Sequence, residues 1–456
     1  MKCFAVFACL VVLVTWTGSA GAQYPPGKQF SPNIHLVTHV PLAGAQKISD
    51  IEVEQDLSRP YAYLSRGPNP IGFDIVTFKD PAHAHRLYNW TINNADLNQG
   101  RGVNGKYFKL KGRYYYVQAV QIRNGSPDHD LSVIIFDVTG LPDTTKIKEV
   151  GRIRMPDAPG GAHNLFPYRH SDGRTLLFFS VEAPATYPYG AMVYDMEKFL
   201  AGAPDQGKVT GIPLPDPRGW NPAPGAKGYH DEYVAYDVAN HRDLFYGGGP
   251  ETSPLGGNFV YDITDLNNPK LIASVIAQSS MQSGGHTFVA TPDGRYALTI
   301  MTSPAHQPVR IWDLKPALDG TTPAIKTPIG EWSAETPSKS GHMIELRWPY
   351  AFIADYEQGL RVLDIRNPTD PVEVGFYDTY NYHVSFEGGG VAFGAYGLDV
   401  RNADGLIVVA DDYSGFWAFR MDGFDGWNGH DWGMPNVSSV QDWDNGPEGV
   451  PTKKVS

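Results

Sequence analysis

The chain has 456 residues, of which 42% are hydrophobic and 19% are charged, with 49 glycines, 37 prolines, 25 tyrosines and 21 phenylalanines. This composition is sufficient to bury a large core, and the abundance of turn residues and aromatics favours an all-β protein over a helical one. The formal net charge of −12, which no basic cluster offsets, argues against nucleic acid or an anionic membrane as a partner.

Residues 1–22 have the features of a secretory signal peptide, with an apolar run at Phe4–Trp16 and small residues at Ala20–Ala22 before the cleavage point. The apolar run is too short to cross a bilayer comfortably, so we expect no membrane span and a secreted or periplasmic location. Both cysteines, Cys3 and Cys9, lie in this segment. The mature chain should therefore have neither a disulfide nor a thiol ligand.

A strand–turn–strand pattern recurs along the rest of the chain, and several of its turns are marked by Asp-Gly. A four-stranded sheet cannot bury both of its faces alone, so repeated copies are expected to stack on one another. The seven predicted strand pairs are Ile51–Leu64, Tyr107–Gln118, Leu165–Ser180, Glu232–Gly247, Thr287–Met301, Met343–Ala354 and Gly397–Ala410.

The third strand of six units ends in an apolar run followed by an aspartate, which we expect to accept hydrogen bonds from the backbone of the next turn. These residues are Asp74, Asp137, Asp195, Asp262, Asp313 and Asp364. One short helix is predicted, at Asp195–Gly202.

The seventh unit has its third strand at Phe416–Met421 and no fourth strand, whereas Asn33–Leu42 has the length and alternation of a fourth strand. If this segment completes the last sheet, the two ends of the chain pair and close the ring. The sequence thus predicts a seven-bladed β-propeller with four-stranded blades over residues 23–421. Residues 422–456 are expected to form a tryptophan-containing tail packed on the propeller, with its last residues disordered.

The sixth unit contains the segment AFIADYEQGLRVLDIRNPTDPVEVGFYDT, which ends at Thr379. It resembles the LVIVD-repeat family of secreted and cell-surface β-propellers, whose units carry an AYVADY-like strand, a GLRVVDIS-like strand and an NPxxPVxVGxYDT-like ending. The match is close over this unit and recognisable around Asn258–Ile276. The resemblance implies a fold and a location, but the family has no single activity that could be transferred.

Four consecutive units place a histidine at the start of their first strand, each preceded by glycine within two residues. Because the first strand of each blade lies nearest the propeller axis, these side chains are expected to converge at one end of the axial channel. The other three units have Ser49, Asn104 and Tyr396 at the comparable place. The histidines are His163, His230, His286 and His342, at intervals of 67, 56 and 56 residues.

Converging imidazoles suit a divalent transition metal such as Fe, Zn, Cu or Mn. Three carboxylates, Glu182, Glu251 and Asp355, follow the second strands of blades that carry these histidines, so they are candidates to accept the far N–H of a ligating ring. Two alternatives remain open. The histidines could line a metal-free polar pocket, or they could belong to the repeat and bond only to backbone groups.

The functional hypothesis is a metal-dependent enzyme of oxidoreductase or lyase type that acts on a small or carbohydrate substrate. Tyr229, Asp231 and Tyr396 are the candidate catalytic residues, because they lie beside the predicted ligands or face the channel. The Pro/Gly-rich segment Pro213–Lys227 either folds over the channel mouth or forms a surface loop. The competing hypothesis is a non-enzymatic LVIVD-repeat surface protein that serves as an interaction platform.

Overall fold

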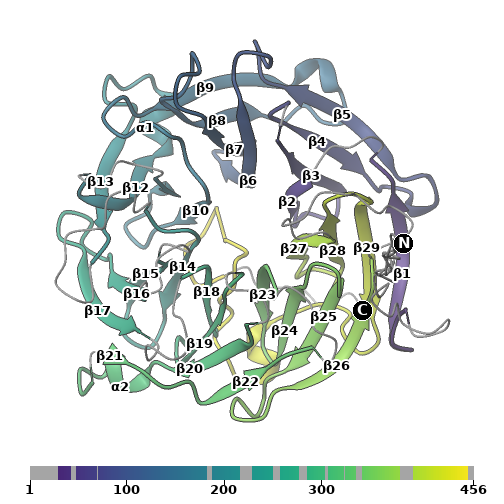
Figure 1. The fold of residues 1–456 in the computed structure, drawn as a ribbon, viewed down its shortest axis with the longest axis vertical. Helices are drawn as coiled ribbons and strands as arrows, with labels where there is room; N and C mark the ends of the chain where they lie inside the picture. Colours follow the sequence, from purple (N-terminus) through teal and green to yellow (C-terminus); the bar gives the residue numbers. More distant parts are fainter. Residues whose placement is uncertain are drawn as a thin grey trace, which may run out of the picture.

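A computed structural model shows seven sheets arranged in a ring about a central axis (Figure 1). The structure describes residues 29–42, 48–68, 70–181, 187–215, 228–249, 257–276, 285–302, 307–322, 324–334, 341–379 and 394–449. Each sheet contains four antiparallel strands, which follow chain order outward from the axis in the first six sheets. The predicted fold, an all-β seven-bladed propeller, is confirmed.

The first four blades run from the N-terminal side of the ring. They are β2 (Ile48–Val53), β3 (Tyr61–Arg66), β4 (Gly72–Thr77) and β5 (His85–Thr91); β6 (Gly100–Leu110), β7 (Arg113–Ile122), β8 (Leu131–Asp137) and β9 (Lys148–Arg154); β10 (Leu165–Arg169), β11 (Thr175–Ser180), β12 (Tyr189–Asp195) and β13 (Lys208–Pro213); and β14 (Glu232–Asp237), β15 (Arg242–Gly248), β16 (Asn258–Asp262) and β17 (Lys270–Val275).

The remaining three blades complete the ring, and a short parallel strand, β21 (Ala324–Ile325), adds to the edge of the fourth blade. They are β18 (Thr287–Ala290), β19 (Tyr296–Ile300), β20 (Val309–Asp313) and β22 (Gly330–Trp332); β23 (Met343–Arg347), β24 (Tyr350–Ala354), β25 (Leu360–Asp364) and β26 (Val372–Tyr377); and β27 (Ala395–Val400), β28 (Ile407–Asp411), β29 (Gly415–Met421) and β1 (Ile34–Val40).

The ring closes as predicted, because β1 pairs antiparallel with β29 as the outer strand of the seventh blade. The register runs from Ile34 opposite Met421 to Val40 opposite Phe416, with one irregularity after Leu36. Backbone hydrogen bonds within the seventh sheet thus join the N-terminal and C-terminal strands of the propeller and close the ring.

The hydrophobic core lies between blades, and this explains why the strands in the middle of each blade are buried along most of their length. Tyr63 of the first blade stacks on Tyr116 of the second at a centroid distance of 4.6 Å. Tyr246 of the fourth blade contacts Phe288 of the fifth at 5.7 Å. Each blade therefore depends on both neighbours to cover its apolar faces.

Five of the six strand-closing aspartates accept a backbone N–H from the residue two positions later, as predicted, at 3.0 Å in each case. Asp74 does not, because it lies inside β4 and accepts a hydrogen bond from Asn89 on β5. In the first blade Thr77 lies opposite the first residue of β3, the register position that Asp364 occupies in the sixth blade. The prediction for Asp74 was wrong because the same pattern also fits a strand interior.

Helical structure is sparse in the described residues. The predicted short helix is present as α1 (Met196–Leu200), capped by the Asp195 carboxylate, and a second one, α2 (Lys315–Leu318), follows β20. Single 3-10 turns occupy Pro81–His83, Thr144–Lys146 and Gly429–Trp432. No helix in the described part of the chain has the length and apolar character needed to cross a membrane.

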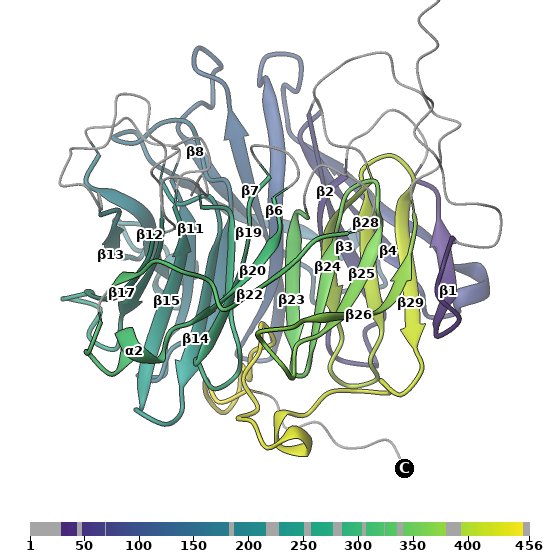
Figure 2. The same ribbon diagram turned by 60° about the horizontal axis from the view of Figure 1, so that its bottom comes forward.

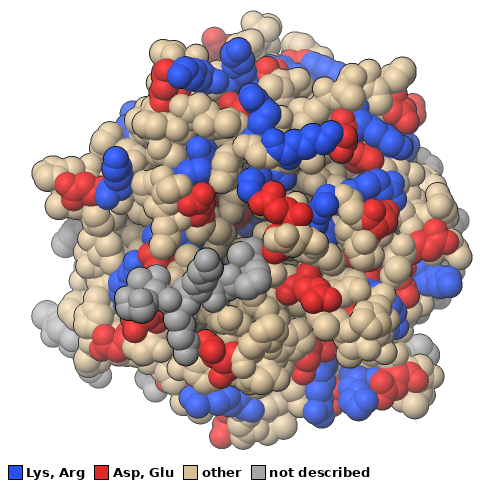
Figure 3. All heavy atoms as spheres, turned by 180° about the vertical axis from the view of Figure 1, so that it is seen from behind, with Lys and Arg blue, Asp and Glu red and all other residues tan. Residues whose placement is uncertain are grey.

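Residues that follow β29 run across one side of the ring (Figure 2). Trp427 is buried and donates its indole N–H to the Trp348 carbonyl at 2.9 Å, and Trp443 meets Phe108 edge-on. Residues 1–22 and Pro451–Ser456, to which the signal peptide and the disordered end were assigned, lie outside the described residues. Seen from behind, the molecule carries Lys and Arg interspersed with Asp and Glu (Figure 3).

Candidate functional site

The four predicted histidines lie together where the innermost strands of four successive blades begin. The ring centroids are 3.9 Å apart for His163 and His230, 3.8 Å for His230 and His286, and 4.8 Å for His286 and His342. Tyr396, which belongs to β27 of the next blade, continues the arc at 3.9 Å from His342. The blade period therefore places five aromatic side chains in one arc at the same end of the channel.

The glycines that precede these histidines allow close approach of two blades. Gly161 has a φ of +88°, and a Cβ added there would lie 2.0 Å from the Val120 carbonyl oxygen. At Gly285 an added Cβ would lie 2.0 Å from the Gly249 nitrogen. Because no other residue fits these positions without moving the backbone, glycine here fixes where the histidine enters the channel.

Asp231 is the acceptor at the centre of the arc. Its Oδ1 accepts hydrogen bonds from Asn164 Nδ2 at 2.8 Å and His230 Nδ1 at 3.0 Å, and its Oδ2 accepts from the Thr287 hydroxyl at 2.8 Å. His286 Nδ1 lies 3.4 Å from the same Oδ2. Burial acts to raise the pKa of Asp231, but the neighbouring His230 and His286 outweigh it and hold this pKa well below its usual range. The carboxylate is therefore ionised although it is buried.

Three of the four imidazoles have Nδ1 directed at an acceptor. His230 Nδ1 faces Asp231, and His286 Nδ1 lies 3.1 Å from the Thr287 hydroxyl oxygen, which itself donates to Asp231. His342 Nδ1 donates to the Tyr396 carbonyl at 2.7 Å. A neutral imidazole that carries its proton on Nδ1 has its lone pair on Nε2. This is the tautomer found in metal-ligating histidines, in which a carboxylate or backbone carbonyl fixes the ring.

His163 has the opposite arrangement, because two donors face its Nδ1. Gln121 Nε2 lies 2.9 Å away and Arg101 Nη2 lies 3.3 Å away. The orientation of the Gln121 amide is fixed by its oxygen, which accepts from Arg101 Nε at 2.6 Å. His163 Nδ1 is thus an acceptor, and the proton of this ring resides on Nε2.

Burial lowers the pKa of both His286 and His342 to about 3, with a further contribution from neighbouring imidazoles. The pKa of His163 is also lowered well below its usual range, first by burial, then by His230 and then by Arg101. These three rings are therefore neutral at physiological pH, which is the form that binds a metal ion.

A buried group of His163, His230 and Asp231 could hold a metal ion, because one ligand atom from each lies within 4.8 Å of the others. Two nitrogens bound to one zinc-like ion at about 2.1 Å are separated by at most about 4.2 Å. The group needs a small contraction to reach that geometry, and His163 also has to release the Nε2 proton or its Nδ1 hydrogen bonds to act as a ligand. The chemistry of the donors, imidazole with one carboxylate, fits Zn, Fe, Cu or Mn.

The other predicted site residues are distributed as follows. The Tyr229 hydroxyl donates to the Pro213 carbonyl at 2.5 Å, and its ring packs against Phe245 in the core, so this tyrosine has a structural contact. Asp355 is buried just after β24, where its backbone N–H donates to the Gly359 carbonyl. Glu182, Glu251 and most of the Pro213–Lys227 segment lie outside the described residues.

Arg101 and Gln121 were not predicted from the sequence. The comparable position in the second blade was assigned to Asn104, but β6 starts at Gly100 and its pairing with β7 shifts register between Gly102 and Gly105. Arg101 therefore lies near the start of the innermost strand, in the place that histidine occupies in the next four blades. In the sequence, this irregularity was indicated only by the several glycines at the start of the second blade, Gly100, Gly102 and Gly105.

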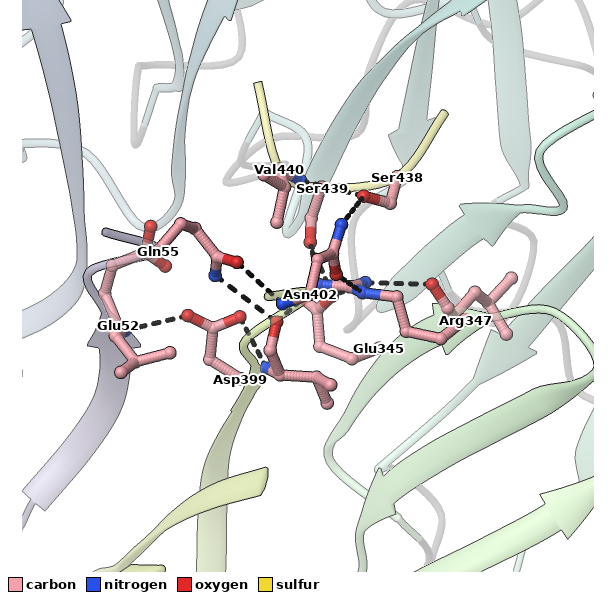
Figure 4. Close-up of polar contacts among 12 residues, drawn as sticks. Glu52, Gln55, Glu345, Arg347, Asp399, Asn402, Ser438, Ser439 and Val440 are labelled. Carbon is pink, nitrogen blue, oxygen red and sulfur yellow. Dashed lines mark hydrogen bonds and ion pairs between the residues drawn. The ribbon is translucent and has the colours of Figure 1, made fainter. Parts of the chain in front are cut away.

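Deeper in the channel, at the far ends of the inner strands, a second polar cluster joins the blades to the C-terminal tail (Figure 4). Lys106 bonds Glu52 at 2.9 Å, and Arg347 bonds Glu345 at 2.8 Å. The tail contributes Ser439, whose hydroxyl donates to Glu345 at 2.6 Å. Since these groups line cavities that also reach Asp231 and Glu232, polar contacts continue along the channel from the histidines to the tail.

Asp50, in β2 of this cluster, provides a pH-dependent contribution to stability. Burial raises its pKa from 3.8 to about 7, so between these pH values the folded state binds a proton that the unfolded state releases. Stability at this site should fall as pH rises from 4 to 7, by up to about 1.4 kcal/mol per pH unit. Asp50→Asn removes this pH dependence. In urea unfolding, the stability of the variant relative to the wild type should therefore increase as the pH is raised from 4 to 8. Parallel pH profiles would contradict this.

The fold and this site define a seven-bladed β-propeller with a histidine/aspartate cluster at one end of its axis. A model of the LVIVD repeat matches residues 346–379, which cover most of the sixth blade. The sixth blade thus contains an LVIVD repeat, and the seven-bladed fold fits the LVIVD-repeat β-propellers that the sequence resembles. A search of curated proteins finds no match to the chain.

Proposed function

We propose that the histidine end of the channel binds one divalent transition metal and that the protein is a metal-dependent enzyme, of oxidoreductase or lyase type, acting on a small or carbohydrate substrate. The observation that carries this proposal is the tautomer set by the surroundings. His230, His286 and His342 each have Nδ1 directed at an acceptor in the protein, which puts the lone pair on Nε2.

In this proposal His230, His286 and His342 supply imidazole nitrogens, and His163 supplies the fourth only if its ring exchanges tautomer. Three protein ligands with an open position are typical of catalytic metal sites, whereas structural sites are closed. The metal would supply Lewis acidity or redox chemistry. Asp231 holds two of the rings in position and makes them better donors, and the buried walls of the channel limit access of water.

The proposed location is secreted or periplasmic, and it rests on the signal-like residues 1–22. Determination of the N-terminal residue of protein recovered from the culture medium or periplasm tests this. A mature chain that starts near Gln23 is the expected result, and a retained Met1 would contradict it.

A second candidate function, an interaction platform, is favoured by the outer strands of the blades. One large apolar side chain is exposed on the fourth strand of each of four different blades, at the rim of the ring. These side chains are Leu36, Val150, Leu271 and Val372. This function uses the rim of the propeller and makes no demand on the histidines.

Metal analysis of the purified mature protein separates the two candidates. We expect about one transition-metal ion per chain in the wild type and a loss of at least tenfold in the His230→Ala/His286→Ala variant. A matched control, His83→Ala/His85→Ala, removes two exposed histidines of the first blade and should retain the metal. Substoichiometric metal that the His230/His286 substitutions leave unchanged would refute the metal site and favour the platform. Circular dichroism confirms that each variant is folded.

A further inference from the structure

We propose that Arg101 is an anion-binding residue of this site and that the ligand it takes is a carboxylate. This inference rests on the proposed function in one respect, since the carboxylate is assigned to the substrate of the metal site. The binding itself is a property of Arg101 and its neighbours.

The position of Arg101 is fixed by the second blade. Arg101 in β6 pairs with Gln121 in β7, and the Gln121 side-chain oxygen accepts from Arg101 Nε at 2.6 Å. The backbone of a neighbouring loop leaves room for it, because a Cβ added to Gly67 would lie 2.6 Å from the Arg101 Cβ. Arg101 Nη2 then reaches to 3.3 Å from His163 Nδ1, at the edge of the histidine arc. The guanidinium is thus held beside the proposed metal position.

The polar partners of Arg101 distinguish it from other buried arginines such as Arg59 and Arg347. Several partly or fully buried arginines elsewhere pair with carboxylates, as Arg59 does with Glu54 and Arg347 with Glu345. In the described part of the chain the polar contacts of Arg101 are with neutral groups, the Gln121 amide and the His163 imidazole. Arg101 is partly buried and its described hydrogen bonds are to neutral groups, so this position favours an anionic ligand.

A carboxylate fits this position better than a phosphate. A guanidinium presents parallel N–H groups that match the two oxygens of a planar carboxylate. One cation also balances the single negative charge of a carboxylate, whereas a phosphate dianion would bring a second charge near the ionised Asp231. The site therefore suits a substrate that carries one carboxylate, such as a small organic acid or a uronate.

The test uses the full chain and three probes: acetate, its neutral counterpart acetamide, and inorganic phosphate. Binding is measured by isothermal titration at constant ionic strength, both as purified and after removal of metal with a chelator. We expect acetate to bind in both states and more tightly than acetamide or phosphate. Arg101→Gln should weaken acetate binding by about tenfold or more, because a charged hydrogen bond is lost. Arg123→Gln, at an exposed arginine beyond the end of β7, is the matched control and should not change it.

The outcomes separate this inference from the proposed function. The carboxylate site would be overturned if Arg101→Gln binds acetate as tightly as the wild type does. It would also be overturned if acetamide or phosphate binds the wild type as tightly as acetate does. Acetate binding that disappears with the metal would also overturn it, because the anion would then bind to the ion. Arg101-dependent binding in a protein that holds no metal would support the site and refute the metal proposal. If Arg101→Gln does not fold, Arg101→Lys takes its place in the test. This variant keeps the charge but not the parallel donors, so it should bind acetate with intermediate affinity.

Discussion

Replacing Arg347 by methionine should lower the free energy of unfolding by about 3–5 kcal/mol, because it leaves a buried carboxylate without its cation. Arg347 ends β23 and its side chain is fully buried. The guanidinium bonds Glu345 at 2.8 Å, the Leu346 and Val400 carbonyls at 2.9 and 2.8 Å, and the Ser439 hydroxyl at 3.1 Å. All these acceptors lose a donor in the variant. Urea unfolding followed by tryptophan fluorescence measures the effect.

The control for this prediction is the double variant Arg347→Met/Glu345→Gln. It removes both charges, so it should recover part of the lost stability, since replacing a whole buried ion pair costs much less than breaking it. If the single and double variants are equally unstable, the loss arises from packing or from the backbone carbonyls, and the ion pair does not carry it.

Arg347 also helps to join the C-terminal tail to the propeller. Arg347 and Glu345 both contact Ser439, and the Asn402 amide donates to the Ser438 hydroxyl at 3.2 Å (Figure 4). These contacts come from the sixth and seventh blades, at the ends of β23 and β27 opposite to the histidines. The tail thus covers the far end of the channel, and the candidate site lies at the other end.

The fold was predictable because its information is repeated. Each blade has the same order of strands and turns, so an error in one copy, such as the assignment of Asp74 to a strand end, does not change the count of blades. The histidine arc was predictable for the same reason. His163, His230, His286 and His342 occupy one position of the repeat, and a common position in a closed ring is a common place on its axis.

The partners of the histidines were not predictable, because they depend on contacts that differ from blade to blade. Arg101 comes from a blade without the histidine, on a strand with an irregular register. His342 Nδ1 donates to the Tyr396 backbone, which no pattern of side chains could reveal. The different tautomers of His163 and His342 follow from these contacts, so four residues alike in sequence have different chemical roles.

Asp231→Asn should reduce metal affinity by about 10–100-fold and also lower stability. Three donors, from Asn164, His230 and Thr287, bond to the Asp231 carboxylate, which only accepts, and His286 is linked to it through Thr287. An amide offers one oxygen and two N–H donors in its place, so at least one buried donor loses its acceptor, at about 1–3 kcal/mol each. One of the two rings is then no longer held with its lone pair on Nε2.

The matched control is Asp237→Asn, at the other end of the same strand. Asp237 is equally buried, at 6% exposed against 7% for Asp231, and it accepts from Asn240 and Arg242. Competition titration with a chromophoric chelator gives the metal affinity of both variants, and urea unfolding gives their stability. The control should lose stability and keep the wild-type affinity. Equal affinity in Asp231→Asn and the wild type would show that Asp231 serves the fold alone and does not hold the ligating rings in position.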